Sequence, residues 1–192
     1  RAGHTVTVFE RDNAIGGLLR YGIPNFKLEK GIIDRRVKIL EAEGIQFKVN
    51  VNVGVNFSVE ELNKFDSIVL CGGATESRSL TTKGIDAKGV VQAMTFLTQQ
   101  TKSLYGEEIQ NKISAKGKNV IVIGGGDTGS DCVGTSNRQG AKSVTNFEIM
   151  SKPPVGRSAS TPWPYWPLQL NTSSSHEEGC DRNWLINTQT LN

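Results

Sequence analysis

The segment Val120-Ile121-Val122-Ile123-Gly124-Gly125-Gly126-Asp127-Thr128-Gly129-Ser130-Asp131-Cys132 determines how we expect this chain to fold. An apolar, β-branched run ends in a Gly-x-Gly-x-x-Gly pattern and continues into small residues that suit a helix. This pattern predicts a strand, a tight turn and a helix whose N-terminus faces a pyrophosphate. In such a turn Gly124 reverses the chain, Gly126 lets the backbone approach the phosphates, and Gly129 lets the helix pack against the strand.

A second nucleotide-binding signal lies at the start of the chain. Thr5 to Glu10 is an apolar run that closes on an acid, which is typical of the strand whose terminal carboxylate binds a ribose. The glycine-rich turn of such a unit precedes the acid by about 20 residues, so it would fall before Arg1. We therefore expect the chain to begin inside a βαβ unit and to be a fragment, with Glu10 as a ribose-binding residue.

Composition excludes several classes of protein. The 192 residues allow one or two domains, and an apolar content of 36% is enough for a small core. The net charge of +3 without a basic block argues against nucleic-acid binding, and the lack of an apolar run of 18 residues argues against a membrane span. Cys71, Cys132 and Cys180 form no C-x-x-C pair, so we interpret them as small buried residues in a reducing, cytoplasmic compartment, without a metal.

The order of predicted elements is that of an α/β protein with two nucleotide-binding units. Apolar periodicity and turn signals predict strands at 5–10, 45–53, 66–71, 119–123 and 143–148 and helices at 28–43, 90–103 and 127–139. Ser58-Val59-Glu60-Glu61 and Ser175-His176-Glu177-Glu178 each suit a helix capping box. Prolines interrupt regular structure after Ser151. We predict a partial domain at 1–88 and a second, incomplete one at 89–192.

Two longer motifs resemble a known family. Ile15-Gly16-Gly17-Leu18-Leu19-Arg20-Tyr21-Gly22-Ile23-Pro24, followed by Phe26-Lys27-Leu28, is similar to the flavin-domain loop of the glutamate synthase small (β) subunit. Cys71 to Arg78 resembles that family's Gly-Gly-Ala-Thr turn, and Gly124 to Cys132 resembles its nicotinamide turn. The segments Trp163 to Pro167 and Thr172 to Gly179 are similar to later parts of the family. The related dihydropyrimidine dehydrogenase shares the architecture, but the sequence Leu18–Pro24 resembles it less well.

The resemblance implies two Rossmann-like domains, an FAD-binding domain with an NAD(P)-binding domain inserted in it, here truncated at both ends. It implies an oxidoreductase that passes hydride from NADH or NADPH to FAD. Electrons then leave through iron–sulfur clusters, held N-terminal to this chain, to the large (α) subunit, which makes glutamate from 2-oxoglutarate and glutamine. By resemblance, the FAD-binding residues are Glu10, Gly17, Leu18, Lys27, Val53, Gly73 and Ala74. The nicotinamide-binding residues are Gly124, Gly125, Gly126, Asp127, Thr128 and Gly129.

The choice between NADH and NADPH rests on the end of the strand at 143–148. Glu148 would bind a free 2′-hydroxyl and repel a 2′-phosphate, which favours NADH. Lys152 and Arg157 follow and could bind that phosphate, so NADPH stays open. Hydride transfer between two cofactors needs no catalytic side chain, and we predict none.

Three other functions remain open from the sequence. They are a dihydropyrimidine dehydrogenase-type subunit, a ferredoxin:NAD(P) oxidoreductase subunit, and a nucleotide-binding fragment without turnover.

Overall fold

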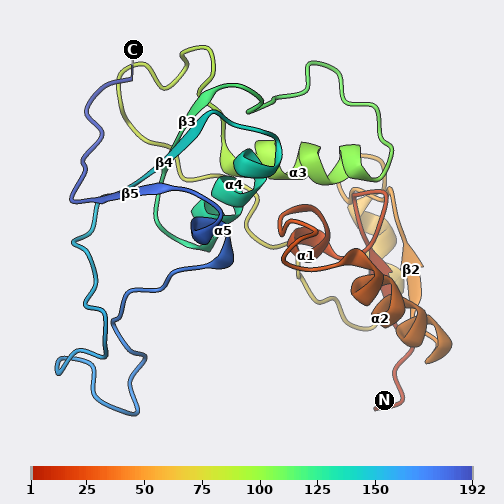
Figure 1. The fold of residues 1–192 in the computed structure, drawn as a ribbon. Helices are drawn as coiled ribbons and strands as arrows, with labels where there is room; N and C mark the ends of the chain where they lie inside the picture. The colour runs from red at the N-terminus through yellow and green to blue at the C-terminus, as the bar shows by residue number, and fades with distance from the viewer. Residues whose placement is uncertain (1, 192) are drawn as a thin grey trace. The chain divides into compact units, whose positions relative to one another are not determined.

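The computed structural model describes residues 2–191 and divides into two compact units, Arg1–Arg78 and Ser79–Asn192 (Figure 1). The first contains β1 (Thr7–Phe9), α1 (Gly17–Tyr21), α2 (Lys30–Ala42), β2 (Gln46–Lys48) and the 3-10 helix η1 (Val59–Lys64). The second contains α3 (Ala93–Leu104), β3 (Asn119–Ile123), α4 (Asp127–Arg138), β4 (Ser143–Glu148), α5 (Ser174–Glu177) and β5 (Asp181–Trp184). No helix among the described residues is long and apolar enough to cross a membrane.

The first unit is built on a parallel pair of strands. β1 pairs with β2 in the register Val8 to Phe47, and the connection between them runs through α1 and α2. α2 turns Ile33, Val37 and Leu40, which share one face at helical spacing, inward, while the rest of the helix is mostly exposed. The helix ends before Gly44, whose φ of +95° suits a residue without Cβ.

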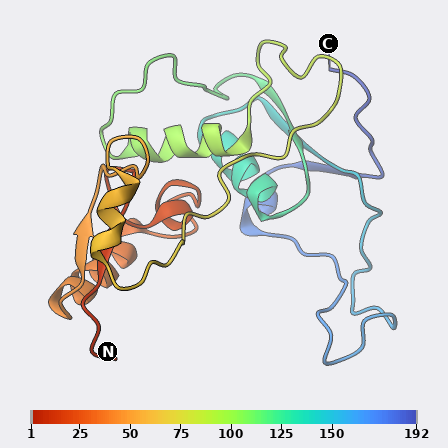
Figure 2. The same cartoon turned by 180° about the vertical axis from the view of Figure 1, so that it is seen from behind.

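The segment at 66–71 differs from its prediction as a buried strand. It has no strand partner among residues 2–191 (Figure 2). Val69 and Leu70 are 81% and 90% exposed. A strand of a parallel sheet is stabilised by ladder hydrogen bonds to its neighbours, and none forms here. Cys71, expected to be buried, is exposed for the same reason.

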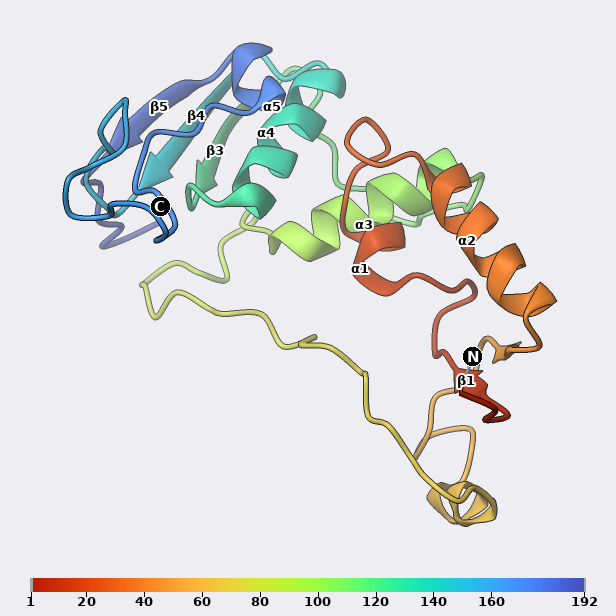
Figure 3. The same cartoon turned by 90° about the horizontal axis from the view of Figure 1, so that it is seen from below.

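The second unit is a three-stranded parallel sheet in the order β3-β4-β5. Its register joins Val122 to Asn146 and Asn146 to Arg182. α4 packs on β3 and β4, and α5 packs on α4, so both helices lie over one face of the sheet (Figure 3). Parallel neighbours in a sheet need a crossover connection, commonly a helix, that lies over a face of the sheet. The α/β topology agrees with the strand–turn–helix–strand pattern of the sequence.

The core of the second unit lies between α3, α4 and the sheet. It consists of Phe96, Leu97, Ala115, Val122, Cys132, Val133 and Val144. Val133 is fully buried, and burial, with a smaller effect from Asp131, raises the pKa of the Cys132 thiol to about 12. Cys132 is therefore a small apolar core residue, as predicted.

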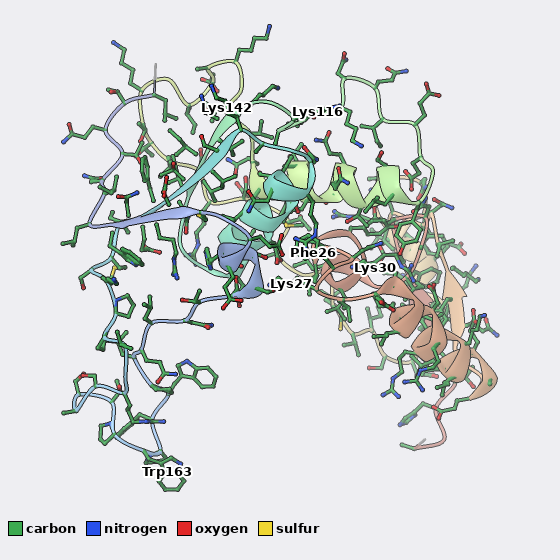
Figure 4. All side chains as sticks on the ribbon, viewed as in Figure 1. Phe26, Lys27, Lys30, Lys116, Lys142 and Trp163 are labelled. Carbon is green, nitrogen blue, oxygen red and sulfur yellow. The ribbon has the colours of Figure 1, made fainter. Side chains whose placement is uncertain are left out.

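The proline-rich tail has exposed aromatic rings and two short regular elements. Trp163 and Trp166 are 83% and 91% exposed, so the aromatic rings of this loop do not pack on the unit, and Trp163 lies at the outer end of the loop (Figure 4). The tail also contains α5, near the capping box predicted at Ser175–Glu178, and β5, which the sequence did not predict. β5 is held by its pairing with β4 rather than by an apolar pattern of its own.

Candidate functional site

The glycine-rich turn lies between the end of β3 and the start of α4. Gly124 has a φ of +117°, a conformation that favours glycine. A Cβ on Gly129 would lie 2.1 Å from the carbonyl oxygen of Gly124, so the helix approaches the turn as closely as glycine allows. A Cβ on Gly126 would meet nothing within 4 Å. The first and third glycines thus build the turn, and the second faces open space.

The N-terminus of α4 is open to a ligand. Gly126 is the N-cap, and among the described residues no side chain caps the helix. Gly126, Asp127 and Thr128 are exposed. The first N–H groups of a helix lack intrahelical partners and carry the positive end of its dipole. This exposed helix end suits a pyrophosphate, whereas two carboxylates are unfavourable to it: that of Asp127 in the first turn of the helix and that of Glu148, which accepts from the N–H of Gly125.

Asn146 fixes the turn from the neighbouring strand, and sequence reasoning missed it. Its side chain is 2% exposed, and its Nδ2 donates to the carbonyl oxygens of Val122, at 3.0 Å, and Gly124, at 2.9 Å. Without the amide of Asn146, each of these two carbonyl oxygens would lose this hydrogen bond at a buried position. The available signal was a polar residue among the inward-facing positions of an otherwise regular strand.

Glu148, at the end of β4, is also bound to the turn. Its Oε2 accepts from the N–H of Gly125 at 2.8 Å, and its Oε1 accepts from the N–H of Met150 at 3.0 Å. A Cβ on Gly125 would lie 2.2 Å from Oε2, so the carboxylate fits against a glycine. Glu148 therefore lies at the predicted edge of the site, with each carboxylate oxygen accepting from a backbone N–H.

The two cations that could bind a 2′-phosphate have different surroundings. Arg157 is exposed and donates to the carbonyl oxygens of Thr161 and Tyr165, which holds its own loop together. The ammonium of Lys152 lies 4.9 Å from the ring centre of Trp184, the last residue of β5. Lys152 thus lies next to the sheet, whereas Arg157 contacts its own loop. A cofactor role for Arg157 stays a prediction.

In the first unit, Glu10 directly follows β1. Its Oε1 accepts from the N–H of Asp12 at 3.0 Å, and its own N–H donates to the carbonyl of Lys48. Val53 forms an isolated bridge with Phe57. Gly73 and Ala74 lie in the exposed segment without regular structure. The structure thus places Glu10 at the carboxyl end of a parallel strand, where a ribose-binding acid belongs.

The glycine-rich loop at 14–24 contains the one-turn helix α1. Gly17 begins this helix with a φ of +49°, and a Cβ there would meet nothing within 4 Å. Leu18 is 59% exposed, and Lys27 is exposed after the loop. The roles of these residues toward FAD stay predictions.

Lys30 organises this loop and was not singled out from the sequence. Its side chain is 1% exposed, and its ammonium donates to the carbonyl oxygens of Leu19, at 2.9 Å, Leu28, at 3.0 Å, and Ile23 (Figure 4). A buried charge needs such polar partners. Residues 19–28 therefore fold around one ammonium group.

The two capping boxes predicted from sequence each differ in detail from the structure. Ser58 does cap η1, but its Oγ accepts from the N–H of Glu60 instead of Glu61. That arrangement, chiefly the Ser58 hydroxyl, lowers the pKa of Glu60. The box of α5 joins Ser173 to His176, whose Nδ1 lies 3.0 Å from the Ser173 hydroxyl oxygen. The Ser175–Glu178 prediction was therefore wrong by two residues.

The Thr172–Gly179 segment attaches α5 to α4. The amide of Asn137 donates to the carbonyl of Gly179 at 2.8 Å, and Arg138 forms an ion pair with Glu178. The hydroxyls of Ser130 and Ser173 are also hydrogen-bonded to each other. The segment thus has a structural role that places β5 beside β4.

Comparison with known proteins identifies similar chains. The chain is 53% identical over its full length to the glutamate synthase [NADPH] small chain of Mycobacterium tuberculosis and 51% identical, over 93% of its length, to that of Bacillus subtilis. It is 50% identical, over 93% of its length, to the glutamate synthase [NADH] of Saccharomyces cerevisiae. It covers 40%, 37% and 8% of these relatives. No family model matches. The resemblance indicated by the sequence motifs is confirmed.

Solved structures agree on the fold. FprA from Mycobacterium tuberculosis, solved in complex with NADPH, matches 77% of this chain and 37% of its own with a TM-score of 0.60. The sequence identity is 21%, so this likeness concerns the fold alone. It confirms the α/β, Rossmann-like architecture.

Proposed function

Starting from the match of this chain to a segment of glutamate synthase small chains, we propose that it is part of the electron-input flavoprotein of a glutamate synthase. In this proposal the second unit binds NADPH or NADH, and the first unit contributes to an FAD site. The chain spans about two fifths of the length of the bacterial relatives, so the activity as a whole is an inference from them.

The observation that carries the proposal is the geometry of the glycine-rich turn. Gly129 leaves no space for a side chain, whereas Gly126 borders open space at an uncapped helix N-terminus. A turn built only for chain reversal has no need for the second glycine, whose φ of −79° suits other residues. An approaching pyrophosphate explains why that position is bare.

The residues of the first unit contribute binding and orientation. Glu10 would bind the FAD ribose, and Val53 would meet adenine through its backbone. Gly17, Leu18 and Lys27 would border the pyrophosphate and flavin, and Gly73 and Ala74 would pass beside the ring system. The flavin, when bound, supplies the hydride-accepting chemistry. Lys30 keeps the loop that carries Leu18 and Lys27 in one shape.

The proposed partner is a glutamate synthase large chain. In the relatives from Saccharomyces cerevisiae and Schizosaccharomyces pombe, the matching segment covers only 8% and 9% of one polypeptide named glutamate synthase. The segment there is fused to a much larger protein, which supports an association with other glutamate synthase parts here. Iron–sulfur clusters outside this chain and a cytoplasmic location belong to the same proposal.

The nucleotide part can be tested on the 192-residue chain. We expect calorimetric titration to show binding of NADPH or NADH to the wild type and its loss in Gly126→Val, because the valine side chain would occupy the space of the pyrophosphate. Gly156→Val is the matched control: a Cβ there also meets nothing within 4 Å, but the residue lies away from the turn. Absence of binding in the wild type, or equal binding in Gly126→Val, would contradict the proposal.

A further inference from the structure

Two hydroxyl groups and one imidazole connect α5 to the first turn of α4. The hydroxyl of Ser130 is hydrogen-bonded to that of Ser173, whose oxygen lies 3.0 Å from Nδ1 of His176. Ser130 follows Gly126 by one helical turn, and its N–H donates to the Gly126 carbonyl at 3.0 Å. We call Ser130, Ser173 and His176 the serine–histidine cluster. This cluster begins one turn away from the exposed N-terminus of α4.

The docking of α5 on α4 depends on polar groups (Figure 3). Ser130 is 5% and His176 9% exposed, and the two buried residues of α5, Ser175 and His176, are both polar. The hydroxyl oxygens of Thr135 and Ser175, one on each helix, are buried without a hydrogen-bond partner among residues 2–191. Buried hydroxyls without partners cost free energy. The docked position of α5 therefore depends on the hydrogen bonds that do form.

The imidazole of His176 makes its hydrogen bonds only in the neutral form. Its Nδ1 accepts from the N–H of Ser173, which completes the capping box of α5. A nitrogen that accepts must have a lone pair, so the proton of the neutral ring is on Nε2. A second proton would place an N–H on Nδ1, opposite the N–H of Ser173, and would add a charge to a buried ring. Protonation therefore opposes the docked position.

Neighbouring charges change the pH of this effect but not its direction. The charged and titratable groups on α4, on α5 and on the residues that follow α5 are Asp127, Asp131, Cys132, Arg138, Glu177, Glu178, Cys180, Asp181 and Arg182. Carboxylates favour a protonated ring and cations oppose it. The lone pair at Nδ1 is nevertheless required by the capping box. Acid thus favours release of α5, and these groups set the pH at which the release occurs.

We propose that His176 is a positioning residue that fixes the first turn of α4 only while its ring is neutral, so that protonation releases α5 and weakens nucleotide binding at the glycine-rich turn. Release takes up one proton, so the docked form is favoured at high pH and lost as the pH falls. An ordinary imidazole titrates near pH ~6.5, and one proton changes the ratio of the two forms by up to about 10-fold per pH unit. The inference rests on the proposed nucleotide-binding function and adds a control of that site.

Nuclear magnetic resonance tests the release without any nucleotide. The chain has two histidines, His4 and His176, and His4 is exposed, so long-range proton–nitrogen spectra can follow each ring. We expect an unprotonated Nδ1 on His176 at about pH 8, and protection of the Ser130 and Glu177 amides from hydrogen exchange that falls about 10-fold or more by about pH 5.5. His176→Asn keeps an acceptor oxygen but cannot titrate, so its protection should not depend on pH.

His4→Asn is the matched control and should behave as the wild type does. A protonated Nδ1 on His176 at the higher pH, or wild-type protection that does not change with pH, overturns the inference. If His176→Asn does not fold, the wild-type exchange profile still decides between these outcomes. Ser173→Ala removes the middle of the cluster and should show low protection at both pH values.

Calorimetric titration with NADPH then connects the release to the nucleotide. We expect the wild type and His4→Asn to lose about 5-fold or more in affinity between the two pH values beyond the change in His176→Asn, which includes the titration of the ligand itself. Equal pH profiles in the wild type and His176→Asn overturn the control of binding. Failure of the wild type to bind NADPH or NADH overturns the proposed function and this control with it, whereas the exchange experiment alone decides whether acid releases α5.

Discussion

Replacing Gly129 by alanine should push the first turn of α4 away from the end of β3. The new Cβ would lie 2.1 Å from the carbonyl oxygen of Gly124, whereas ordinary contact begins at 3.4 Å. The helix and the turn must therefore separate by about 1.3 Å, the difference between these distances. The same carbonyl accepts from the buried amide of Asn146 at 2.9 Å, so the movement also strains that hydrogen bond.

The expected cost follows from these two effects. Overpacking of a close contact costs about 1–3 kcal/mol, and loss of a buried hydrogen bond costs about 1–3 kcal/mol. Replacing glycine within a helix returns about 1 kcal/mol. We therefore expect Gly129→Ala to lower the free energy of unfolding of the second unit by about 1–5 kcal/mol.

Tryptophan fluorescence during urea unfolding measures this directly. All three tryptophans, at 163, 166 and 184, belong to the second unit. Gly126→Ala is the matched control: its new Cβ meets nothing within 4 Å and its φ of −79° suits alanine, so its stability should change by less than about 1 kcal/mol. An unfolding midpoint for Gly129→Ala equal to that of the wild type would refute the reasoning.

Three further predictions concern buried groups. Asn146→Leu should leave two carbonyl oxygens without their hydrogen bonds and destabilise the second unit by about 1–3 kcal/mol, measured by the same urea titration; an unchanged midpoint would contradict this. Lys30→Met should leave the carbonyls of residues 19, 23 and 28 without their ammonium and speed proteolysis within 16–28, unlike exposed Lys38→Met. The pKa of Cys132, raised from 9.0 to about 12, means that above pH 9 only the unfolded state loses this proton. The free energy of unfolding should then fall with pH by up to about 1.4 kcal/mol per pH unit up to about pH 12, and less steeply in Cys132→Ala.

Segments with strong local patterns were predicted well. The strands at 119–123 and 143–148 have the predicted bounds, because apolar β-branched runs between turn residues specify a strand locally. The inward face of α2 likewise follows from its 3.6-residue period. The α/β class and the glycine-rich turn could therefore be obtained from the sequence.

Elements that depend on distant partners could not be obtained in this way. Asp181, Arg182 and Asn183 have no apolar alternation, and they form β5 only by pairing with β4. The run at 66–71 shows the opposite case. Its apolar residues predicted a strand, but no neighbouring strand pairs with it among residues 2–191. Strand identity is set by non-local hydrogen bonds as well as by composition.

The candidate site shows the same limit. The spacing of the glycines at 124, 126 and 129 is enough to predict their role. The roles of Asn146 and Lys30 could not be predicted, since an asparagine in a strand or a lysine in a helix is ordinary until its hydrogen-bond partners are known. Their carbonyl partners lie up to 24 residues away along the chain.

The proline-rich excursion after β4 is closed at its base. The N–H of Leu170 donates to the carbonyl of Pro154, Arg182 contacts Asn171, and α5 is attached to α4 just beyond. The position of β5 is therefore independent of the residues at 155–169. Doubling the length of such a closed loop costs only about 0.6 kcal/mol in closure entropy. This excursion is thus the place where an epitope tag or a fluorescent label can be inserted, and where insertions and deletions can accumulate during evolution without shifting the sheet.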